Sequence, residues 1–289
     1  MALGNLAQRF LVALVAVPIL LVVLYYHRPE PTWALIFAAS LIAMHELFAM
    51  LLPAEDRRAA LVMGGLAVAA FYWLDPLALR IYSALPSVLL GAVAAGSTIP
   101  LMFAVVVPGL YYLFRFRDIP SVAGRYAATV TGIVYAGYLT TYLAKLKLID
   151  RDQGGDAVLI VLIVAWLADT GGYFAGRFLG KARLYEAVSP KKTWAGAWGG
   201  IAGSVIGVAA LKLISAHGLT WLDVGLIAIP GGILGQLGDL TESLIKRSVG
   251  VKDSGALLPG HGGLLDRIDA VLFIAPYVYG YLVVRGAIG

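Results

Sequence analysis

The stretch DLTESLIKRSVGVKDSGALLPGHGGLLDRID, residues 239–269, is a block of charge within a chain that is otherwise strongly apolar. Its charged side chains are Asp239, Glu242, Lys246, Arg247, Lys252, Asp253, Asp266, Arg267 and Asp269. A charge beside hydrocarbon is costly unless it is paired, solvated or bound to a metal, so such groups are usually functional. We therefore expect this block to carry the function, and the flanking apolar runs to hold it at a membrane surface.

The composition predicts an all-α, polytopic integral membrane protein. Of the 289 residues, 60% are hydrophobic and 13% charged, against about 45–50% and about 25% in an average soluble domain. The mean hydropathy is +0.85. The net charge of +5 is too small and dispersed to indicate a nucleic-acid partner. Since cysteine is absent, disulfides, cysteine metal sites and cysteine nucleophiles are excluded.

Apolar runs long enough to cross a bilayer, about 17–25 residues, occur along the whole sequence. They lie at 9–26, 33–52, 99–115, 122–144, 156–179, 194–215, 221–245 and 266–285. No small-x-small cleavage site follows the first run, so we interpret it as a retained span. The region 59–95 fits either one span with a partly inserted segment or two short spans broken at Asp75-Pro76. The total is therefore nine or ten transmembrane helices.

The distribution of Lys and Arg favours nine spans. With a cytoplasmic N-terminus, nine spans place fifteen of the 22 basic residues inside and six outside, and leave Arg80 unplaced. Ten spans give fourteen against eight, a weaker positive-inside bias. Both versions put the loops 180–193 and 246–265 on the same, cytoplasmic side, because two spans separate them.

Three polar groups in the second half of the chain are candidates for a site, and the first is WLADTGGYFAGRFLGKARL, residues 166–184. Asp169 falls in the interior half of an apolar run, and on a helix it shares one face with Gly172, Tyr173 and Gly176. This face could line a cavity. The alternative is that Asp169 pairs with a Lys or Arg of a neighbouring helix.

The second group is SPKKTWAG, residues 189–196. Ser189 is a suitable N-cap and Pro190 suits the first helical position, which predicts a helix with Lys191, Lys192 and Thr193 in its first turn. Two cations there oppose the helix dipole, and a bound anion would resolve the conflict. The alternative is a positive-inside pair near a span end.

The third group is the charged block itself. Gln236, Asp239, Ser243 and Lys246 recur on one helix face, which predicts a helix leaving the membrane. The glycine-rich segment 250–263 predicts a loop.

Within that loop, His261, Gly262 and Gly263 could expose successive backbone N–H groups as an anion nest. Asp266 and Asp269 then begin the last span, one turn apart. Carboxylates are also simply favoured at a helix start.

In the first half of the chain, His45 and Glu46 are the polar exception inside a span. We interpret them as a helix-interior or interface pair in preference to a catalytic one.

Two carboxylates on adjacent helices, Asp239 and Asp266, suit Mg²⁺, which is commonly held by one or two carboxylates together with substrate phosphates. The sequence has no HExxH zinc pattern and no GxxxxGK[ST] loop, so zinc-protease and P-loop chemistry are excluded. No histidine stands at a spacing that would make it a base for Ser189 or Ser243.

The segment SLIKR, four further residues, KDSG and LPGHGGLLDRID, from Ser243 to Asp269, resembles the phosphatidate cytidylyltransferase (CDP-diglyceride synthase) family. ADTGGYFAGRFLGK and SPKKTWAG match further blocks of that family, so the resemblance covers roughly 156–289. It implies a dimeric enzyme of the cell (inner) membrane, with nine spans and a cytoplasmic active site. The implied reaction transfers a cytidylyl group from CTP to phosphatidic acid, giving CDP-diacylglycerol and pyrophosphate.

The resemblance also implies dependence on Mg²⁺, with K⁺ also implicated, and places the metal-binding aspartates on Asp239 and Asp266. On this basis we expect 1–120 to form N-terminal transmembrane helices for scaffold and dimerisation, and 121–289 to form the catalytic domain.

Because phosphatidic acid is already an anion, its phosphate can attack CTP with little need for a general base, and catalysis rests on positioning and charge neutralisation. We assign phosphate binding to Lys191, Lys192, Lys246, Arg247, Lys252 and Arg267. Nucleotide or metal contacts are assigned to Asp169, Tyr173, Ser189, Thr193, His261, Gly262 and Gly263, with Asp169 as a further metal group. The alternatives are a CTP-dependent lipid or polyprenol kinase and a membrane transporter with broken helices.

Overall fold

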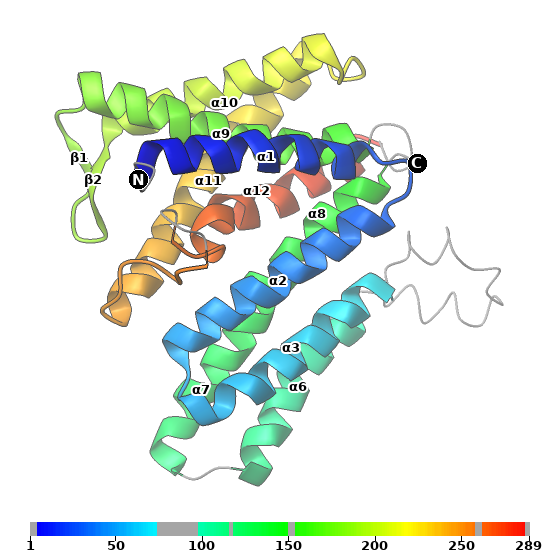
Figure 1. The fold of residues 1–289 in the computed structure, drawn as a ribbon, viewed down its shortest axis with the longest axis vertical. Helices are drawn as coiled ribbons and strands as arrows, with labels where there is room; N and C mark the ends of the chain where they lie inside the picture. Colours follow the sequence, from blue (N-terminus) through cyan, green and yellow to red (C-terminus); the bar gives the residue numbers. More distant parts are fainter. Residues whose placement is uncertain (1–4, 74–97, 116–117, 150–153, 258–261, 287–289) are drawn as a thin grey trace.

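The computed structural model describes residues 5–73, 98–115, 118–149, 154–257 and 262–286 (Figure 1). These residues form helices and one short hairpin. The elements are α1 (Asn5–Tyr25), α2 (Glu30–Leu51), α3 (Ala54–Trp73), α6 (Thr98–Arg115), α7 (Ile119–Gly132), η1 (Ile133–Tyr138), α8 (Leu139–Leu148), α9 (Gly154–Leu179), β1 (Arg183–Tyr185), β2 (Ser189–Thr193), α10 (Trp194–Ile214), α11 (Trp221–Ser248) and α12 (Leu265–Val284).

The prediction of an all-α polytopic membrane protein is confirmed. Within the described ranges, six helices are long and apolar enough to cross a membrane: α2, α6, α9, α10, α11 and α12. Their bounds fall within three residues of the runs read from the sequence. The first part of the ambiguous region 59–95 lies in α3, and its remainder, 74–95, lies outside the described residues.

One predicted span, 122–144, is a composite helix. It consists of α7 and α8 joined by the π-helical η1, and such wider turns occur as bulges within α-helices. Where η1 begins, the chain passes very close to α2, since a Cβ on Gly132 would lie 2.1 Å from Phe48 Cε1. The ring of Phe48 therefore requires glycine at this position.

The helices form two groups (Figure 1). In the upper part of the view α9 and α10 lie side by side, and α2, α3, α6 and the α7–α8 rod run together in the lower part. The α9–α10 contact is one of backbones, because a Cβ on Gly203 would lie 2.1 Å from the Leu167 carbonyl oxygen. Small residues allow such an approach between membrane helices. α11 and α12 pack on each other and link the two groups.

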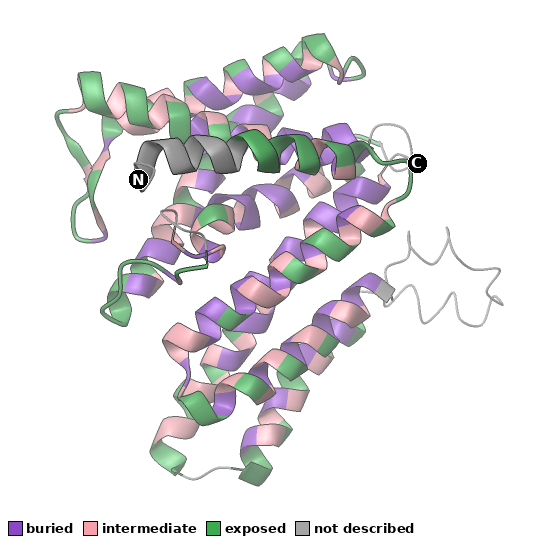
Figure 2. Ribbon diagram, in the orientation of Figure 1, coloured by how far each residue is buried: buried purple, intermediate pink, exposed green. Residues whose placement is uncertain are grey.

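Burial follows this arrangement (Figure 2). α12 and α8 carry long buried faces, whereas the outer face of α10 is exposed and apolar, with Trp198, Ile206 and Leu213 on it. An exposed apolar helix face of this kind is expected where the surroundings are lipid.

The structure corrects the prediction that Ser189 and Pro190 open a helix. Residues 189–193 form β2, which pairs with β1 in antiparallel register, Arg183 opposite Thr193. Thr193 is the N-cap of α10, and its Oγ1 accepts the Gly196 amide at 3.1 Å. Ser and Thr are both good N-caps. Ser189, however, belongs to a strand that pairs with β1, so the helix begins after Thr193. The two lysines therefore precede the helix and do not lie in its first turn.

The predicted loop is confirmed at its described residues, 250–257 and 262–263. α11 continues through Lys246 and Arg247 as far as Ser248. Gly250 and Gly262 have φ values of +74° and +79°, which glycine adopts without strain. These two positions turn the chain away from α11 and into α12.

Candidate active site

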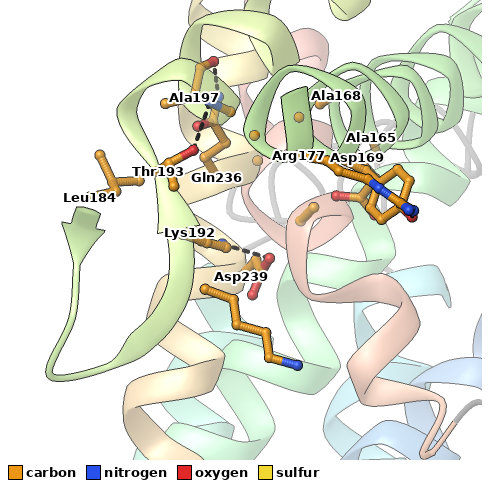
Figure 3. Close-up of a pocket in the computed structure, with 17 residues that line it drawn as sticks. Ala165, Ala168, Asp169, Arg177, Leu184, Lys192, Thr193, Ala197, Gln236 and Asp239 are labelled. Atoms are coloured by element: carbon orange, nitrogen blue, oxygen red, sulfur yellow. Dashed lines mark hydrogen bonds and ion pairs between the residues drawn. The ribbon is translucent and has the colours of Figure 1, made fainter. Parts of the chain in front are cut away.

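A cavity of about 400 Å³ opens between α9, α10, α11 and the hairpin (Figure 3). Its volume is in the usual range for a small-molecule site. Among the residues that line it are the predicted Asp169, Tyr173, Lys191, Lys192, Thr193 and Asp239. The two upstream sequence groups and the first carboxylate of the charged block therefore meet in one place.

The α9 wall confirms the predicted helix face, since Asp169, Gly172, Tyr173 and Gly176 all line the cavity. Asp169 is exposed to it. Arg177, one turn beyond Tyr173, also lines it and donates from Nη1 to the Tyr173 hydroxyl at 2.6 Å. α9 thus presents a carboxylate, a phenol and a guanidinium to one space.

The opposite wall is built on an ion pair. Lys192 Nζ, from β2, lies 2.6 Å from Asp239 Oδ2 on α11 (Figure 3). Both side chains remain partly exposed, at 25% and 32%, and Ser243 Oγ donates to Asp239 Oδ1 at 3.3 Å. Lys192 is therefore paired with Asp239. Asp169 interacts electrostatically with both Asp239 and Lys192.

A glutamine fixes the position of this wall. Gln236, one turn before Asp239, donates from Nε2 to the Ala197 carbonyl at 3.1 Å and the Gly232 carbonyl at 3.2 Å. Because Ala197 is on α10, this hydrogen bond fixes the position of α11 along α10. Asp239 is thereby held beside Lys192.

Asp266 has a different environment. Lys246 Nζ lies 2.6 Å from its Oδ1, and the Ser254 and Gly263 amides donate to its Oδ2 at 3.0 and 2.8 Å. Lys246 also pairs with the buried Glu242. These groups form a closed network beside the cavity, and Asp266 is absent from the described residues that line the cavity.

Comparison with known proteins identifies the family. Residues 7–285 match the model of the cytidylyltransferase family. The chain belongs to this family. It is 38% identical over 146 residues to a phosphatidate cytidylyltransferase of Bacillus subtilis, covering 50% of this chain and 54% of the relative.

Two further relatives carry the same name. A phosphatidate cytidylyltransferase of Synechocystis is 37% identical over 186 residues, 54% of this chain and 62% of the relative. One of Brucella suis is 42% identical over 149 residues, 51% of this chain and 54% of the relative. The matched part spans between half and two thirds of the length of each of these relatives.

In this cytidylyltransferase-family chain, the other predicted site residues that the structure describes are not in the cavity lining. These are Ser189, Lys246, Arg247, Lys252, Gly262, Gly263, Asp266 and Arg267. Arg247 Nη1 donates to the Val251 carbonyl at 2.8 Å, so it stabilises the turn after α11. Lys252 is exposed in the loop. Arg267 is exposed and interacts electrostatically with Asp169.

The predicted anion nest is only partly described, because His261 lies outside the described residues. Gly262 has the positive φ that a nest requires. The Gly263 amide, however, donates to the chain's own Asp266. The anion at this nest is therefore an internal carboxylate.

Sequence reasoning left two carboxylates of this region out of the site. Asp269, one turn beyond Asp266, interacts electrostatically with Asp239 and Asp169, and Glu242 is fully buried beside Lys246. The i+3 spacing of Asp266 and Asp269 was a signal, but it is also typical of a helix start. For Glu242, the i+4 spacing to Lys246 indicated only a helix pair.

The donors present fit a magnesium ion that is completed by its substrates. Among the described residues, no three His, Asp or Glu side chains gather into a complete metal site. Asp169 and Asp239 nevertheless face the same cavity, and one or two carboxylates plus phosphate oxygens are the usual protein environment of Mg²⁺.

Proposed function

We propose that this chain transfers a cytidylyl group from CTP to phosphatidic acid, producing CDP-diacylglycerol and pyrophosphate. The observation that carries the proposal is the cavity that Lys191 and Lys192 line together with Asp169 and Asp239. The two carboxylates belong to α9 and α11, which are helices of membrane length. Cations suit phosphates, and carboxylates suit the metal that accompanies them. Membership of the cytidylyltransferase family and the names of the relatives support the proposal.

In this reaction a lipid phosphate oxygen forms a bond to the α-phosphorus of CTP, and the bond from that phosphorus to the bridging oxygen breaks. The electron pair leaves with pyrophosphate. Lys191 and Lys192 neutralise phosphate charge, and Lys192 exchanges its contact with Asp239 for one with substrate. Tyr173 and Arg177 hold a second part of the substrate from α9. Catalysis rests on positioning and on fixed charges aimed at the phosphates.

Asp239 and Asp169 would hold the Mg²⁺, which supplies charge neutralisation on the phosphates when bound. Asp266 remains a predicted ligand, and K⁺ a predicted second ion. Binding of an ion by Asp266 requires Lys246 to move, since that ammonium already occupies Oδ1. If the Asp239→Asn and Asp266→Asn variants both kept near-wild-type Mg²⁺-dependent turnover, the metal assignment would be wrong.

The proposal includes a nine-span homodimer in the cell (inner) membrane, with the cavity on the cytoplasmic side. The positive-inside count supports this orientation. We retain 1–120 as the scaffold and dimerisation part and 121–289 as the catalytic part.

One labelling experiment tests the reaction and its rivals. Purified protein in lipid is given phosphatidic acid and CTP labelled at either the α- or the γ-phosphate. We expect the α-label in lipid, with one pyrophosphate released per label and none without phosphatidic acid. The γ-label in a lipid alcohol would identify the kinase instead. Movement of substrate across vesicles without pyrophosphate would identify a transporter.

A further inference from the structure

One buried carboxylate of the first half of the chain contacts the charged block. Glu46 lies on α2 with 5% of its surface exposed. It accepts hydrogen bonds from Ser254 Oγ at 3.2 Å, the Leu264 amide at 2.9 Å and the Leu265 amide at 2.8 Å. A buried carboxylate is stable only when its oxygen atoms have donors, and both oxygens of Glu46 have them.

Two of these bonds cap α12 from another helix. The N-cap residue of α12 is Leu264, which makes no side-chain cap hydrogen bond because leucine has no acceptor. The first amides of a helix need acceptors, and negative charge is favourable there. Glu46, 218 residues away from Leu264 in the chain, supplies both the acceptors and the negative charge.

Glycines on either side of the carboxylate show that the space is shaped for it. A Cβ on Gly263 would lie 2.5 Å from Glu46 Oε2, and one on Gly255 would lie 2.7 Å from Oε1. A larger residue at either position would displace the Glu46 carboxylate from its donors or displace the segment that carries them. Glycine at 255 and 263 therefore allows the loop to close on Glu46.

The same segment holds Asp266. Ser254 donates its hydroxyl to Glu46 and its amide to Asp266, so the two carboxylates share one residue between them. Asp266 Oδ1 in turn lies 2.6 Å from Lys246 Nζ. Lys246 is two turns beyond Asp239 on α11. A continuous set of contacts thus runs from α2, through the start of α12, to the helix that forms the cavity wall.

We propose that Glu46 is a positioning residue for the cytidylyl transfer described above, on which this inference rests. Glu46 fixes the start of α12 and, through Asp266 and Lys246, the end of α11 that carries Asp239. Its effect on the reaction is exerted through these groups, without contact between Glu46 and the substrates.

The test is the Glu46→Gln variant, which keeps the shape of the side chain. It replaces one carboxylate oxygen, an acceptor, with an NH₂ group, which cannot accept a hydrogen bond from the loop or from α12. The matched control is Asp223→Asn. Asp223 is also a buried helix-capping carboxylate, 4% exposed, but it lies at the other end of α11. His45→Gln, at the exposed neighbour of Glu46, is the control for changes to this part of α2.

We expect Glu46→Gln to lower kcat about 10- to 100-fold, the usual result of displacing reacting groups slightly, and to change the KM for CTP less than kcat. Hydrogen exchange at the Leu264 and Leu265 amides should become faster. Asp223→Asn should lower the unfolding temperature but leave both kcat and that exchange unchanged, and His45→Gln should leave all of these unchanged.

If Glu46→Gln does not accumulate as folded protein, Ser254→Ala decides the question, because it removes one of the three bonds and should lower kcat about fivefold. A kcat within twofold of wild type, in whichever of the two variants is folded, overturns the inference. A wild-type protein that releases no pyrophosphate overturns the proposed function as well, so the two failures are distinguishable.

Discussion

The two ends of α11 place a carboxylate in opposite situations. At the start, Asp223 completes a capping box with Thr220, accepts the Tyr281 hydroxyl, and lies 2.9 Å from Arg285 Nε. Its side chain is 6% exposed. About 24 Å further along the helix axis, Asp239 has one ion pair and one long hydrogen bond. Its side chain is 32% exposed and faces a cavity.

On the proposed function, the difference separates a structural carboxylate, Asp223, from one that is available to a ligand, Asp239. A carboxylate whose oxygens are all used by the fold stabilises that fold and has little capacity for a ligand. One with free oxygen positions beside a cavity can exchange its partner for a substrate or metal. Charge alone therefore does not identify the site, whereas the number of internal donors does.

The sharpest test of this comparison is Asp239→Asn. We expect it to lower kcat/KM for cytidylyl transfer about 100- to 1,000-fold, as for other groups that stabilise transition-state charge. The unfolding temperature should change less than in Asp223→Asn, because both side chains of the pair with Lys192 are partly exposed, whereas Asp223 is buried. The measurements are α-label transfer to lipid and thermal unfolding of the same preparation. Retained activity in this variant would remove the distinction between the two ends.

Lys192→Met tests the partner of Asp239. Loss of a charged hydrogen-bond donor to phosphate should lower kcat/KM about 10- to 100-fold, and a higher KM for CTP should account for most of the loss. Lys181→Met, at an exposed lysine just before the hairpin, is the control for net charge. Equal losses in the two variants would mean that Lys192 acts only through long-range charge.

Asp223→Asn tests the other end of the helix. We expect a destabilisation of about 1–3 kcal/mol, because buried donors lose their acceptor, with kcat unchanged well below the unfolding temperature. Thermal unfolding and pyrophosphate release, measured on one sample, give both values. A large fall in kcat at unchanged stability would show that this end also contributes to the reaction.

The smallest expected effect concerns the start of α10. Thr193→Val removes the cap to Gly196 and should destabilise the protein by about 1 kcal/mol. Ser189→Ala, in the strand, should change stability by no more than a few tenths of that, since Ser189 is not a cap. Chemical or thermal unfolding of the two variants measures the difference. A larger effect of Ser189→Ala than of Thr193→Val would favour a helix that begins at Ser189.

The long helices that the structure describes could be predicted from the sequence, because hydropathy and helix faces are local patterns. The runs 194–215 and 266–285 match α10 and α12 within one residue, and the face of α9 that carries Asp169 lines the cavity as expected. The start of α10 was misplaced because two cap residues, Ser189 and Thr193, compete locally. Pairing with β1, a tertiary contact, decides between them.

The site was only partly readable. Asp239 and Asp266 look alike in the sequence, as a carboxylate on each of two adjacent helices, yet one faces the cavity and the other is enclosed by Lys246 and two amides. Glu46 was interpreted, together with His45, as a helix-interior or interface pair. Its donors lie 208–219 residues away, and no spacing rule connects residues so far apart.

By itself the sequence determined a helical membrane protein and the approximate bounds of the six candidate spans that the structure describes. These follow from the cost of placing polar groups in hydrocarbon and from the period of the helix, which are properties of neighbouring residues. The tertiary structure alone decided which carboxylate faces the cavity, which lysine pairs with it, and that Glu46 caps α12. Whether a charged side chain is satisfied or available depends on donors brought from distant segments, and only packing brings them together.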